Sequence, residues 1–499
     1  MREPEYIRQQ YSAILSSLGI ILMLASGVIL SPCLLLFSFP EEKPHALAFV
    51  FPAIGLLLFG LVLWRVFRRE HSVSLSVKEG GVIVLLGWVV VTIVSAFPFM
   101  EILALPFSRA LFESVSGWTT TGLSVIDVTS AGPMILCFRS TMQLAGGAGF
   151  AIIMMSAILG PTGTGISQAE GRGAQLVPQV RQSARLVLVL YASYAAIGSF
   201  AYWMAGMSPF DALNHSFCAV STGGFSTRPD SIGHWDSVVI EAVTIPLMIL
   251  GNTSFVTAWL LLKGKFRSVI RNGEVRVVAV LIPISIAALF IFITHGLYPQ
   301  LGKAVRVAVF ESITALTTTG YSTVSYSGWG SFGWLLLFGL MLIGGGTSST
   351  AGGIKQFRAY LLAKAVGWEV KRMLLPRSVL MERPIWEGNR RTFVDDGRVR
   401  QVATFVFLYL VLFFSGSLVL AASGYSLSDS LFEFASAMGT VGLSVGVTSE
   451  TMPDAALWAE IVAMYVGRLE IFVVIAGVWK IGRDSRIMLT GHEKEKKHA

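Results

Sequence analysis

Long apolar runs alternate with short polar segments along the whole chain of 499 residues. A run of about 20 predominantly apolar residues is long enough to cross roughly 30 Å of hydrocarbon as a helix. Runs of this kind cover about 14–37, 46–64, 81–100, 133–159, 184–206, 237–262, 275–296, 331–366, 402–424 and 455–479. The pattern therefore predicts an all-α membrane protein that crosses the bilayer many times.

Four shorter apolar stretches lie between pairs of these runs, at about 107–118, 209–220, 304–316 and 428–438. A helix of 11 to 13 residues rises only about 16–20 Å, which is too short to cross the hydrocarbon. The stretches therefore predict re-entrant half-helices, each followed by an extended loop. Irregular backbone at membrane depth must be buried in protein or face water, because lipid offers no hydrogen bonds.

One pentapeptide pattern, Thr-any-Gly-apolar-Ser, follows each short stretch. Its copies are TTGLS at 120–124, TGGFS at 222–226, TTGYS at 318–322 and TVGLS at 440–444. Wide, fairly regular spacing indicates one structural unit used four times, read as helix, half-helix, loop, helix. The predicted divisions are a two-span hairpin at 1–70 and pore repeats at 71–165, 166–270, 271–395 and 396–499. We expect the four units to surround a single axis.

The composition of these loops suits a cation pathway. Four strands that contribute one backbone carbonyl each per layer can replace the hydration shell of an ion, and glycine allows the positive φ that such a strand needs. The pentapeptides contain no Asp or Glu. The alternative is that their small residues only mark close helix packing. The predicted filter residues are Thr120, Thr121, Gly122, Thr222, Gly223, Gly224, Thr318, Thr319, Gly320, Thr440, Val441 and Gly442.

Glutamates precede three of the four pentapeptide glycines by nine positions, at Glu113, Glu311 and Glu433, whereas the second copy has His215 there. Two roles fit these acids. They could attract cations to the pore mouth, or they could complement the dipole of a short helix near its start.

The distribution of charge matters more than the net value of +8. Basic clusters lie near 65–78, 172–185, 263–276, 355–400 and after 480. They fall at alternate ends of the predicted spans, as the positive-inside rule expects, which places both termini and the basic loops in the cytoplasm. The surplus charge thus reflects membrane topology and does not predict nucleic-acid binding.

Composition also excludes most enzyme classes. Hydrophobic residues make up 54% of the chain and charged residues only 14%, which is far too apolar for a soluble enzyme of this length. We find no nucleotide-binding fingerprint, nucleophile motif or His-rich metal cluster in the sequence. The protein is therefore expected not to be an enzyme and to bind no cofactor beyond the ion it carries.

Ten small residues interrupt the second helix of the third repeat. Each glycine costs about 1 kcal/mol relative to alanine in a helix, and the interruption starts about 13 apolar residues into the run. The break is therefore expected inside the membrane, against protein or the pore; the alternative is a cytoplasmic linker. Its residues are Gly344, Gly345, Gly346, Thr347, Ser348, Ser349, Thr350, Ala351, Gly352 and Gly353.

Arg468 lies about 13 residues into the last span. A charge at that depth needs water or a partner and is a functional candidate by default. It is expected either to face the cavity beneath the loops as an electrostatic barrier or to pair with another helix. Arg139, in the second helix of the first repeat, raises the same question.

The four T-x-G-apolar-S loops, the leading two-span hairpin and YVGRLEIF at 465–472 together resemble the Trk-type potassium uptake proteins over essentially the whole chain. The resemblance implies ten transmembrane helices, four re-entrant pore hairpins and a pseudo-fourfold pore that takes up K⁺. It also implies that Gly344–Gly353 is the gating loop and that Arg468 is the barrier.

Further expectations rest on the resemblance alone. They are a homodimer in a bacterial inner membrane and a cytosolic TrkA-like regulatory subunit that binds NAD(H) or ATP/ADP. The runner-up function is a proton- or sodium-coupled potassium symporter, because broken helices and internal repeats also occur in secondary transporters. Four repeats in the same direction favour a channel.

Overall fold

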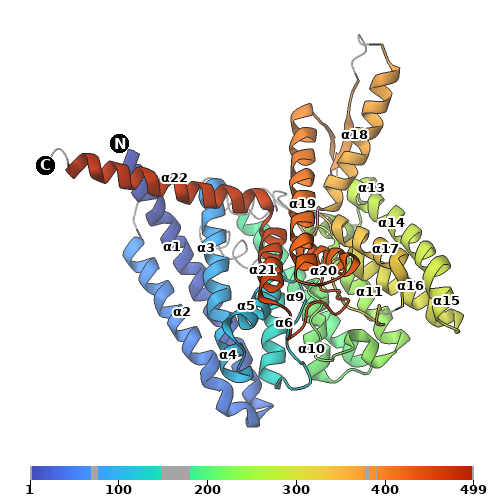
Figure 1. Cartoon of the computed structure of the whole chain (residues 1–499), viewed down its shortest axis with the longest axis horizontal. Coiled ribbons are helices and arrows are strands. Elements are labelled where there is room, and N and C mark those ends of the chain that lie inside the picture. Colours follow the sequence, from blue (N-terminus) through green and yellow to red (C-terminus); the bar gives the residue numbers. More distant parts are fainter. Residues whose placement is uncertain are drawn as a thin grey trace.

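The computed structural model describes residues 3–68, 77–147, 180–326, 328–376, 381–387 and 390–496. Regular structure in these residues is almost entirely helical (Figure 1). The strands found there, β1 (Pro384–Glu387) and β2 (Arg390–Phe393), form a small antiparallel hairpin. The predicted divisions at 70 and 165, the end of the predicted helix 133–159 and basic residues such as Arg172 lie outside the described residues.

The N-terminal hairpin consists of α1 (Glu3–Leu30) and α2 (Ala46–Phe67), joined by the 3₁₀ helices η1 (Ser31–Phe37) and η2 (Pro40–His45). α1 packs on both α2 and α3 (Val77–Ser95), and the short α4 (Phe97–Leu103) follows α3 (Figure 1). The side of α2 away from α1 presents large apolar side chains such as Phe51, of which 68% is exposed. An apolar exposed face of this kind suits contact with lipid.

The first helices of the other three repeats are α9 (Val180–Met204), α14 (Gly273–Leu289) and α19 (Asp396–Ala422). α14 continues through a π-helical turn, η5 (Phe290–Thr294), into α15 (His295–Leu297). The short helix α13 (Phe266–Arg271) precedes α14, where the side chain of Asn272 caps the helix by accepting the N–H of Glu274.

The four half-helices are α5 (Phe107–Trp118), α10 (Pro209–Val220), α16 (Leu301–Leu316) and α20 (Leu427–Gly439). Two coincide with the predicted bounds, and α16 begins three residues earlier than predicted. Ser208 and Ser426 cap α10 and α20 by accepting the N–H of Asp211 and of Asp429, the usual way to satisfy a free helix start. The C-terminal halves of all four are buried.

The second helices differ from the prediction in two repeats. The predicted helix 237–262 is two helices, α11 (Val238–Asn252) and α12 (Phe255–Leu262), bent by 113°. The predicted helix 455–479 is α21 (Asp454–Leu469) and α22 (Ile471–Lys496), bent by 101° at Glu470. α6 (Pro133–Gly147) is the described part of the first repeat's second helix, and η4 (Ser231–Trp235) precedes α11.

The predicted break in the third repeat is present. α17 (Gly330–Ile343) ends at Gly344, and α18 (Gln356–Leu374) begins after the ten small residues. Six described helices are long and apolar enough to cross a membrane, and each bent pair adds one candidate. α17 is a shorter apolar helix, and α6 is the described part of the run predicted at 133–159, so these elements correspond to the ten apolar runs of the sequence.

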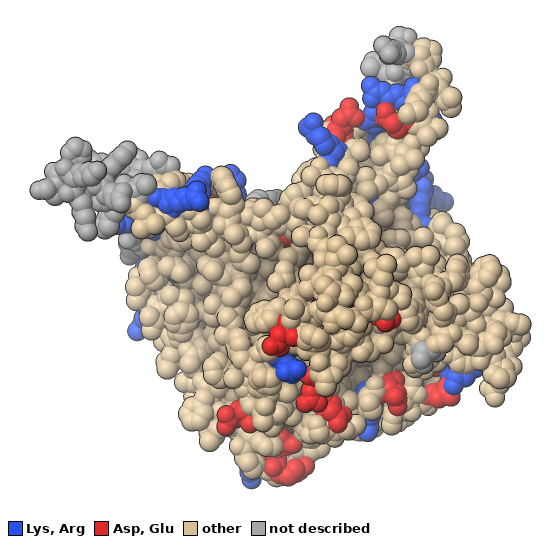
Figure 2. Space-filling model, in the orientation of Figure 1, with Lys and Arg blue, Asp and Glu red and all other residues tan. Residues whose placement is uncertain are grey.

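The two ends of the spans differ in charge. Both chain termini lie at one end, where α22 runs across α1 and α3 and where α18 projects alongside α19 (Figure 1). Lys and Arg side chains gather along α22 and α18, whereas most visible Asp and Glu lie at the opposite edge (Figure 2). This separation is the one that the basic clusters of the sequence predicted.

Candidate functional site

The four pentapeptides have the same backbone conformation. In each, the N–H of the residue before the glycine bonds to the carbonyl five residues earlier, at 2.8–3.1 Å, and so closes the half-helix. The first threonine and the glycine then have positive φ. These values are 56° and 91° in the first copy, 51° and 74° in the second, 53° and 80° in the third, and 48° and 101° in the fourth. A β-branched residue with positive φ is a genuine outlier, and such strain concentrates at functional sites.

The four loops form a closed ring. A Cβ atom on Gly122 would lie closer than 3.0 Å to the carbonyl oxygen of Gly223 in the next loop. The same close approach recurs three times, from Gly224 to Thr319, from Gly320 to Val441, and from Gly442 back to Thr121. Each glycine therefore packs against the carbonyl of the following repeat, and the fourth repeat closes on the first. All twelve predicted filter residues lie in this ring.

A buried polar side chain holds each loop from behind. Glu113 accepts the hydroxyl of Ser124 at 3.0 Å, and Glu433 accepts that of Ser444 at 2.6 Å. Glu311 accepts both the N–H and the hydroxyl of Thr323 at 2.8 Å. His215 takes the same place in the second repeat, with its Nε2 3.0 Å from the Ser226 hydroxyl. All four side chains are fully buried, so the glutamates stabilise the loops and do not line the pore mouth.

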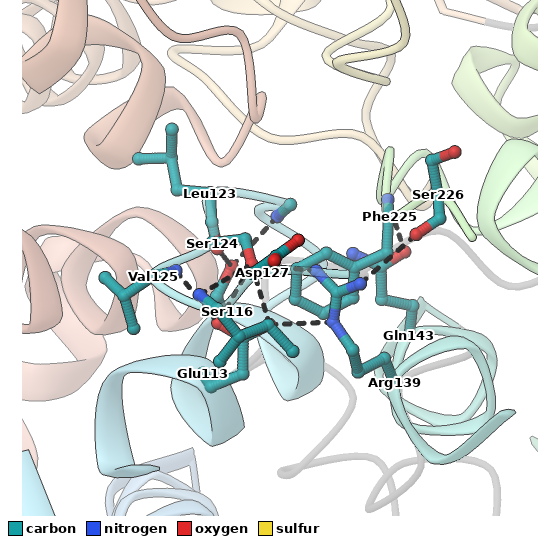
Figure 3. Close-up of polar contacts among 12 residues, drawn as sticks. Glu113, Ser116, Leu123, Ser124, Val125, Asp127, Arg139, Gln143, Phe225 and Ser226 are labelled. Carbon is teal, nitrogen blue, oxygen red and sulfur yellow. Dashed lines mark hydrogen bonds and ion pairs between the residues drawn. The ribbon is translucent and has the colours of Figure 1, made fainter. Parts of the chain in front are cut away.

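Arg139 joins the first two loops (Figure 3). Its Nε donates to Glu113 at 2.7 Å, and its Nη2 donates to the hydroxyl of Ser124 at 2.9 Å. Its Nη1 donates to the carbonyl of Ser226 at 3.2 Å, and the guanidinium lies 3.8 Å from the centre of the Phe225 ring. With 2% of the side chain exposed, Arg139 is a buried ion-pair partner, which answers the question that its position raised.

An open cavity of about 1040 Å³ lies against one side of the ring. The four pentapeptide glycines form its floor, and the segments that leave the pentapeptides line its walls. Asp127 and Asp230 are exposed there, and Arg139 and Arg228 reach the same cavity. The cavity therefore has the shape of a vestibule that ends at the ring of glycines.

The Gly344–Gly353 segment lies against the other side of the ring. The N–H of Gly352 donates to the hydroxyl of Thr318 at 2.8 Å, and the hydroxyl of Thr222 donates to that of Thr350 at 3.1 Å. A Cβ atom on Gly352 would also lie closer than 3.0 Å to the Thr440 hydroxyl. The segment therefore contacts the first threonine of three of the four pentapeptides and is not a linker outside the membrane fold.

The bend between α11 and α12 holds this segment in place. Hydrogen bonds of 3.2 Å join the two main chains, and Glu274 accepts the N–H of Thr347 at 2.8 Å. The donor and acceptor pairs of the main chain are Gly346 with Asn252, Thr350 with Gly251, and Phe255 with Ser348. The bend thus frees backbone groups that the small-residue segment satisfies, which explains why the predicted continuous helix 237–262 is broken.

Arg468 binds main-chain carbonyls from two repeats. Its Nη1 donates to the carbonyl of Thr350 at 2.7 Å, and its Nη2 donates to the carbonyls of Gly146 and Gly147 at the end of α6. The half-buried guanidinium therefore lies beneath the ring and links the small-residue segment to the first repeat.

The hydroxyls of Thr120 and Thr440 are buried and have no hydrogen-bond partner within the described residues. Buried polar atoms without a partner are rare in native proteins and call for an explanation. Both oxygens belong to pentapeptide loops that form the ring.

A fourfold ring of re-entrant loops within a bundle of spanning helices defines an integral membrane protein of the pore-loop type. The chain belongs to the TrkH family of cation transport proteins, whose model matches residues 47–481. This membership places it among transport proteins and not among enzymes.

Relatives match nearly the whole chain. The Trk system potassium uptake protein TrkH of Salmonella typhimurium is 30% identical, with 93% of this chain and 98% of that protein covered. An uncharacterized cation transporter of Methanocaldococcus jannaschii is 28% identical, with 94% and 95% covered. The crystal structure of the potassium transporter TrkH from Vibrio parahaemolyticus superposes with a TM-score of 0.81 at 29% identity, over 93% of this chain and 98% of that one.

Proposed function

We propose that the protein carries K⁺ across the bacterial inner membrane through the ring of four pentapeptides. The observation that carries this proposal is the closed contact of each filter glycine with the carbonyl of the next repeat. Such a ring can bring one carbonyl oxygen per repeat into a single layer around an ion. The hydroxyls of Thr120 and Thr440, which are buried without a partner in the described residues, would be further oxygen ligands, and relatives named for potassium uptake support the choice of ion.

The direct test uses the purified full chain in liposomes with K⁺ on one side and Na⁺ on the other. A pore of this kind should give a reversal potential that follows the K⁺ gradient. A reversal potential that shifts with a pH or Na⁺ gradient at constant K⁺ would instead favour the coupled symporter. The absence of any preference for K⁺ would remove the ring as a potassium filter.

The Gly344–Gly353 segment is the gate in this proposal. It lies beneath the ring, is hydrogen-bonded to Thr318 and Thr222 and packs against Thr440, so an ion that leaves the ring would meet it next. Arg468 adds a positive charge at the same level. Displacement of the segment would open the path without altering the ring.

Deletion of Thr347–Ala351 tests the gate. The deletion protein should keep the ion preference of the wild type but should conduct in the absence of any partner protein. Deletion of Lys263, Gly264 and Lys265 provides the control, since this turn between α12 and α13 is exposed and lies outside both the ring and the segment. A deletion protein that remains closed would place the gate elsewhere.

Regulation is proposed to come from the end of the molecule that carries α18 and both termini, which we take as cytoplasmic. The basic side chains on α18 and α22 support this orientation, because cytoplasmic loops are enriched in Lys and Arg. A cytosolic TrkA-like subunit that binds NAD(H) or ATP/ADP would act on α18, which follows the gating segment directly. The homodimer remains a proposal that rests on the family resemblance.

A further inference from the structure

Gln143 of α6 stands behind the loop of the second repeat. The side chain is fully buried. Its Nε2 donates a hydrogen bond of 2.6 Å to the carbonyl oxygen of Gly223, and its Oε1 accepts the N–H of Phe225 at 3.2 Å (Figure 3). One side chain therefore holds the strand on both sides of the filter glycine Gly224.

This contact makes the second quarter of the ring different from the first and third. In those two repeats the residue before the glycine is a threonine whose hydroxyl bonds to a threonine two positions earlier. The pairs are Thr121 with Thr119 and Thr319 with Thr317, each at 2.8 Å. Gly223 has no side chain, and a Cβ atom there would lie closer than 3.0 Å to the amide of Gln143. Gln143 thus fills the space that a side chain at 223 would need.

The carbonyl of Gly223 also differs from its counterparts in its hydrogen bonding. The four carbonyls that pack against the glycines of the ring belong to Thr121, Gly223, Thr319 and Val441. Among the described residues, Gly223 is the one of these four whose carbonyl accepts a hydrogen bond from a side chain. An N–H group close to a carbonyl oxygen reduces the negative field that the oxygen presents to an ion. Field strength is one of the properties that separate K⁺ from Na⁺ in carbonyl filters.

We propose that Gln143 is a specificity-determining residue of the ion pathway. By its bond to the Gly223 carbonyl it weakens the field of one ring oxygen and fixes the position of that oxygen. A weaker field disfavours the smaller Na⁺, which must recover more hydration energy from its ligands. The proposal rests on the proposed function, because it requires the ring to be a potassium filter.

The test compares the K⁺ over Na⁺ permeability ratio of variants of the full chain in liposomes. Gln143→Met keeps the approximate size of the side chain but removes the donor, and Gln143→Asn keeps the amide but shortens its reach. Each should lower the ratio by about three- to tenfold, the factor expected for the net contribution of one hydrogen bond. Met142→Leu is the matched control, because Met142 is also fully buried on α6 but packs against Gly117 of the first half-helix.

A double substitution tests whether Gln143 occupies the space that a side chain at position 223 would need. Gly223→Thr alone should lower the ratio, because its Cβ atom would displace the amide of Gln143. Gly223→Thr combined with Gln143→Ala should recover part of the ratio, since the threonine then has the room that Thr121 and Thr319 have. The φ of Gly223 is not positive, so threonine can adopt it.

Ion-dependent thermal stability in detergent provides a second readout that needs no open pore. Wild-type protein should be stabilised more by K⁺ than by Na⁺, and both Gln143 variants should lose most of that difference. If the wild type shows K⁺ preference in both assays and the Gln143 variants match Met142→Leu, the role of Gln143 is overturned while the filter stands. A wild type without K⁺ preference would instead overturn the proposed function.

Discussion

Arg358, near the start of α18, and Glu470, at the bend between α21 and α22, form an ion pair of 2.7 Å. Less than a fifth of either side chain is exposed, and the guanidinium also lies 3.8 Å from the centre of the Phe405 ring on α19. Glu470 has a φ of 64°, so it occupies the bend itself. The helix that follows the Gly344–Gly353 segment is therefore tied to the broken helix of the fourth repeat.

Loss of this ion pair should favour the open state. A hydrogen bond between charged groups contributes about 1.5–3 kcal/mol, so Glu470→Gln should raise partner-independent K⁺ flux in liposomes by at least about tenfold. The charge swap Arg358→Glu with Glu470→Arg should bring flux back toward the wild-type level. Equal flux in wild type and Glu470→Gln would show that the pair does not couple the two helices to the gate.

Serine at the filter glycines should reduce selectivity. In Gly122→Ser or Gly442→Ser, the new Cβ atom would meet the carbonyl of a neighbouring repeat, and positive φ is strained for serine. We expect the K⁺ over Na⁺ ratio, measured from bi-ionic reversal potentials, to fall by roughly tenfold or more, which corresponds to about 1.4 kcal/mol.

Gly446→Ser is the control for these two variants. Gly446 also has positive φ, at 94°, but a Cβ atom there would meet nothing within 4 Å. The K⁺ over Na⁺ ratio of Gly446→Ser should remain near that of the wild type. A loss of selectivity equal to that of Gly442→Ser would mean that backbone strain, and not contact between repeats, governs the ring.

Two roles for Arg468 can be separated by substitution. Arg468→Ala should raise cation flux without changing ion preference, because it removes both a positive charge near the path and the bond to Thr350. Arg468→Lys keeps the charge but cannot reach both Thr350 and Gly146 with one compact ammonium group. Flux as low as wild type in the lysine variant would indicate an electrostatic barrier, whereas flux as high as in the alanine variant would indicate a structural link.

Acid should reduce the contribution that the ion pairs of Asp236 make to the stability of the fold. Hydrogen bonds from Lys303 and then from Arg306 lower the pKa of the Asp236 carboxyl, which lies in the loop before α11. A lowered pKa means that the ion pairs stabilise the fold at pH values above about 4, the unperturbed value. Their contribution is lost as the pH falls below that value toward the pKa in the folded protein.

Asp236→Asn should therefore be less stable than wild type at pH 7, with a difference that narrows below about pH 4. Thermal unfolding in detergent between neutral and acid pH measures this difference. A difference that stays constant with pH would contradict the assignment. The effect should be small and sensitive to salt, because more than half of the Asp236 side chain is exposed.

Hydropathy predicted the spanning elements and the half-helices well, but it could not predict the two additional bends. The apolar run through 237–262 continues across the bend, since Thr253 and Ser254 lower its hydropathy only slightly. The short sequence GNTS at 251–254 was the available signal, because it resembles the polar break of the third repeat. Glu470 was a similar signal, as a charged residue without an obvious partner inside a span.

The contacts between the loops of the ring, and the side chains that support them, could not be predicted from the sequence either. The repeated pentapeptides indicate four similar loops, but nothing in their spacing says which carbonyl meets which glycine. Gln143 is a neutral polar residue in an apolar run, and its purpose depends on the absence of a side chain at Gly223, 80 positions away. Such a relationship becomes visible only when two repeats are placed side by side.

The four loops belong to one continuous chain, and this gives the ring a freedom that four identical subunits would not have. In a homotetramer, any substitution in one quarter appears in all four, so every change must be tolerated four times at once. Here the residue before the filter glycine is threonine in two repeats, valine in the fourth and glycine only at 223, where Gln143 fills the space of the missing side chain. A single mutation can therefore alter one repeat of the ring and leave the other three unchanged. Small changes in ion preference can thus arise from single mutations.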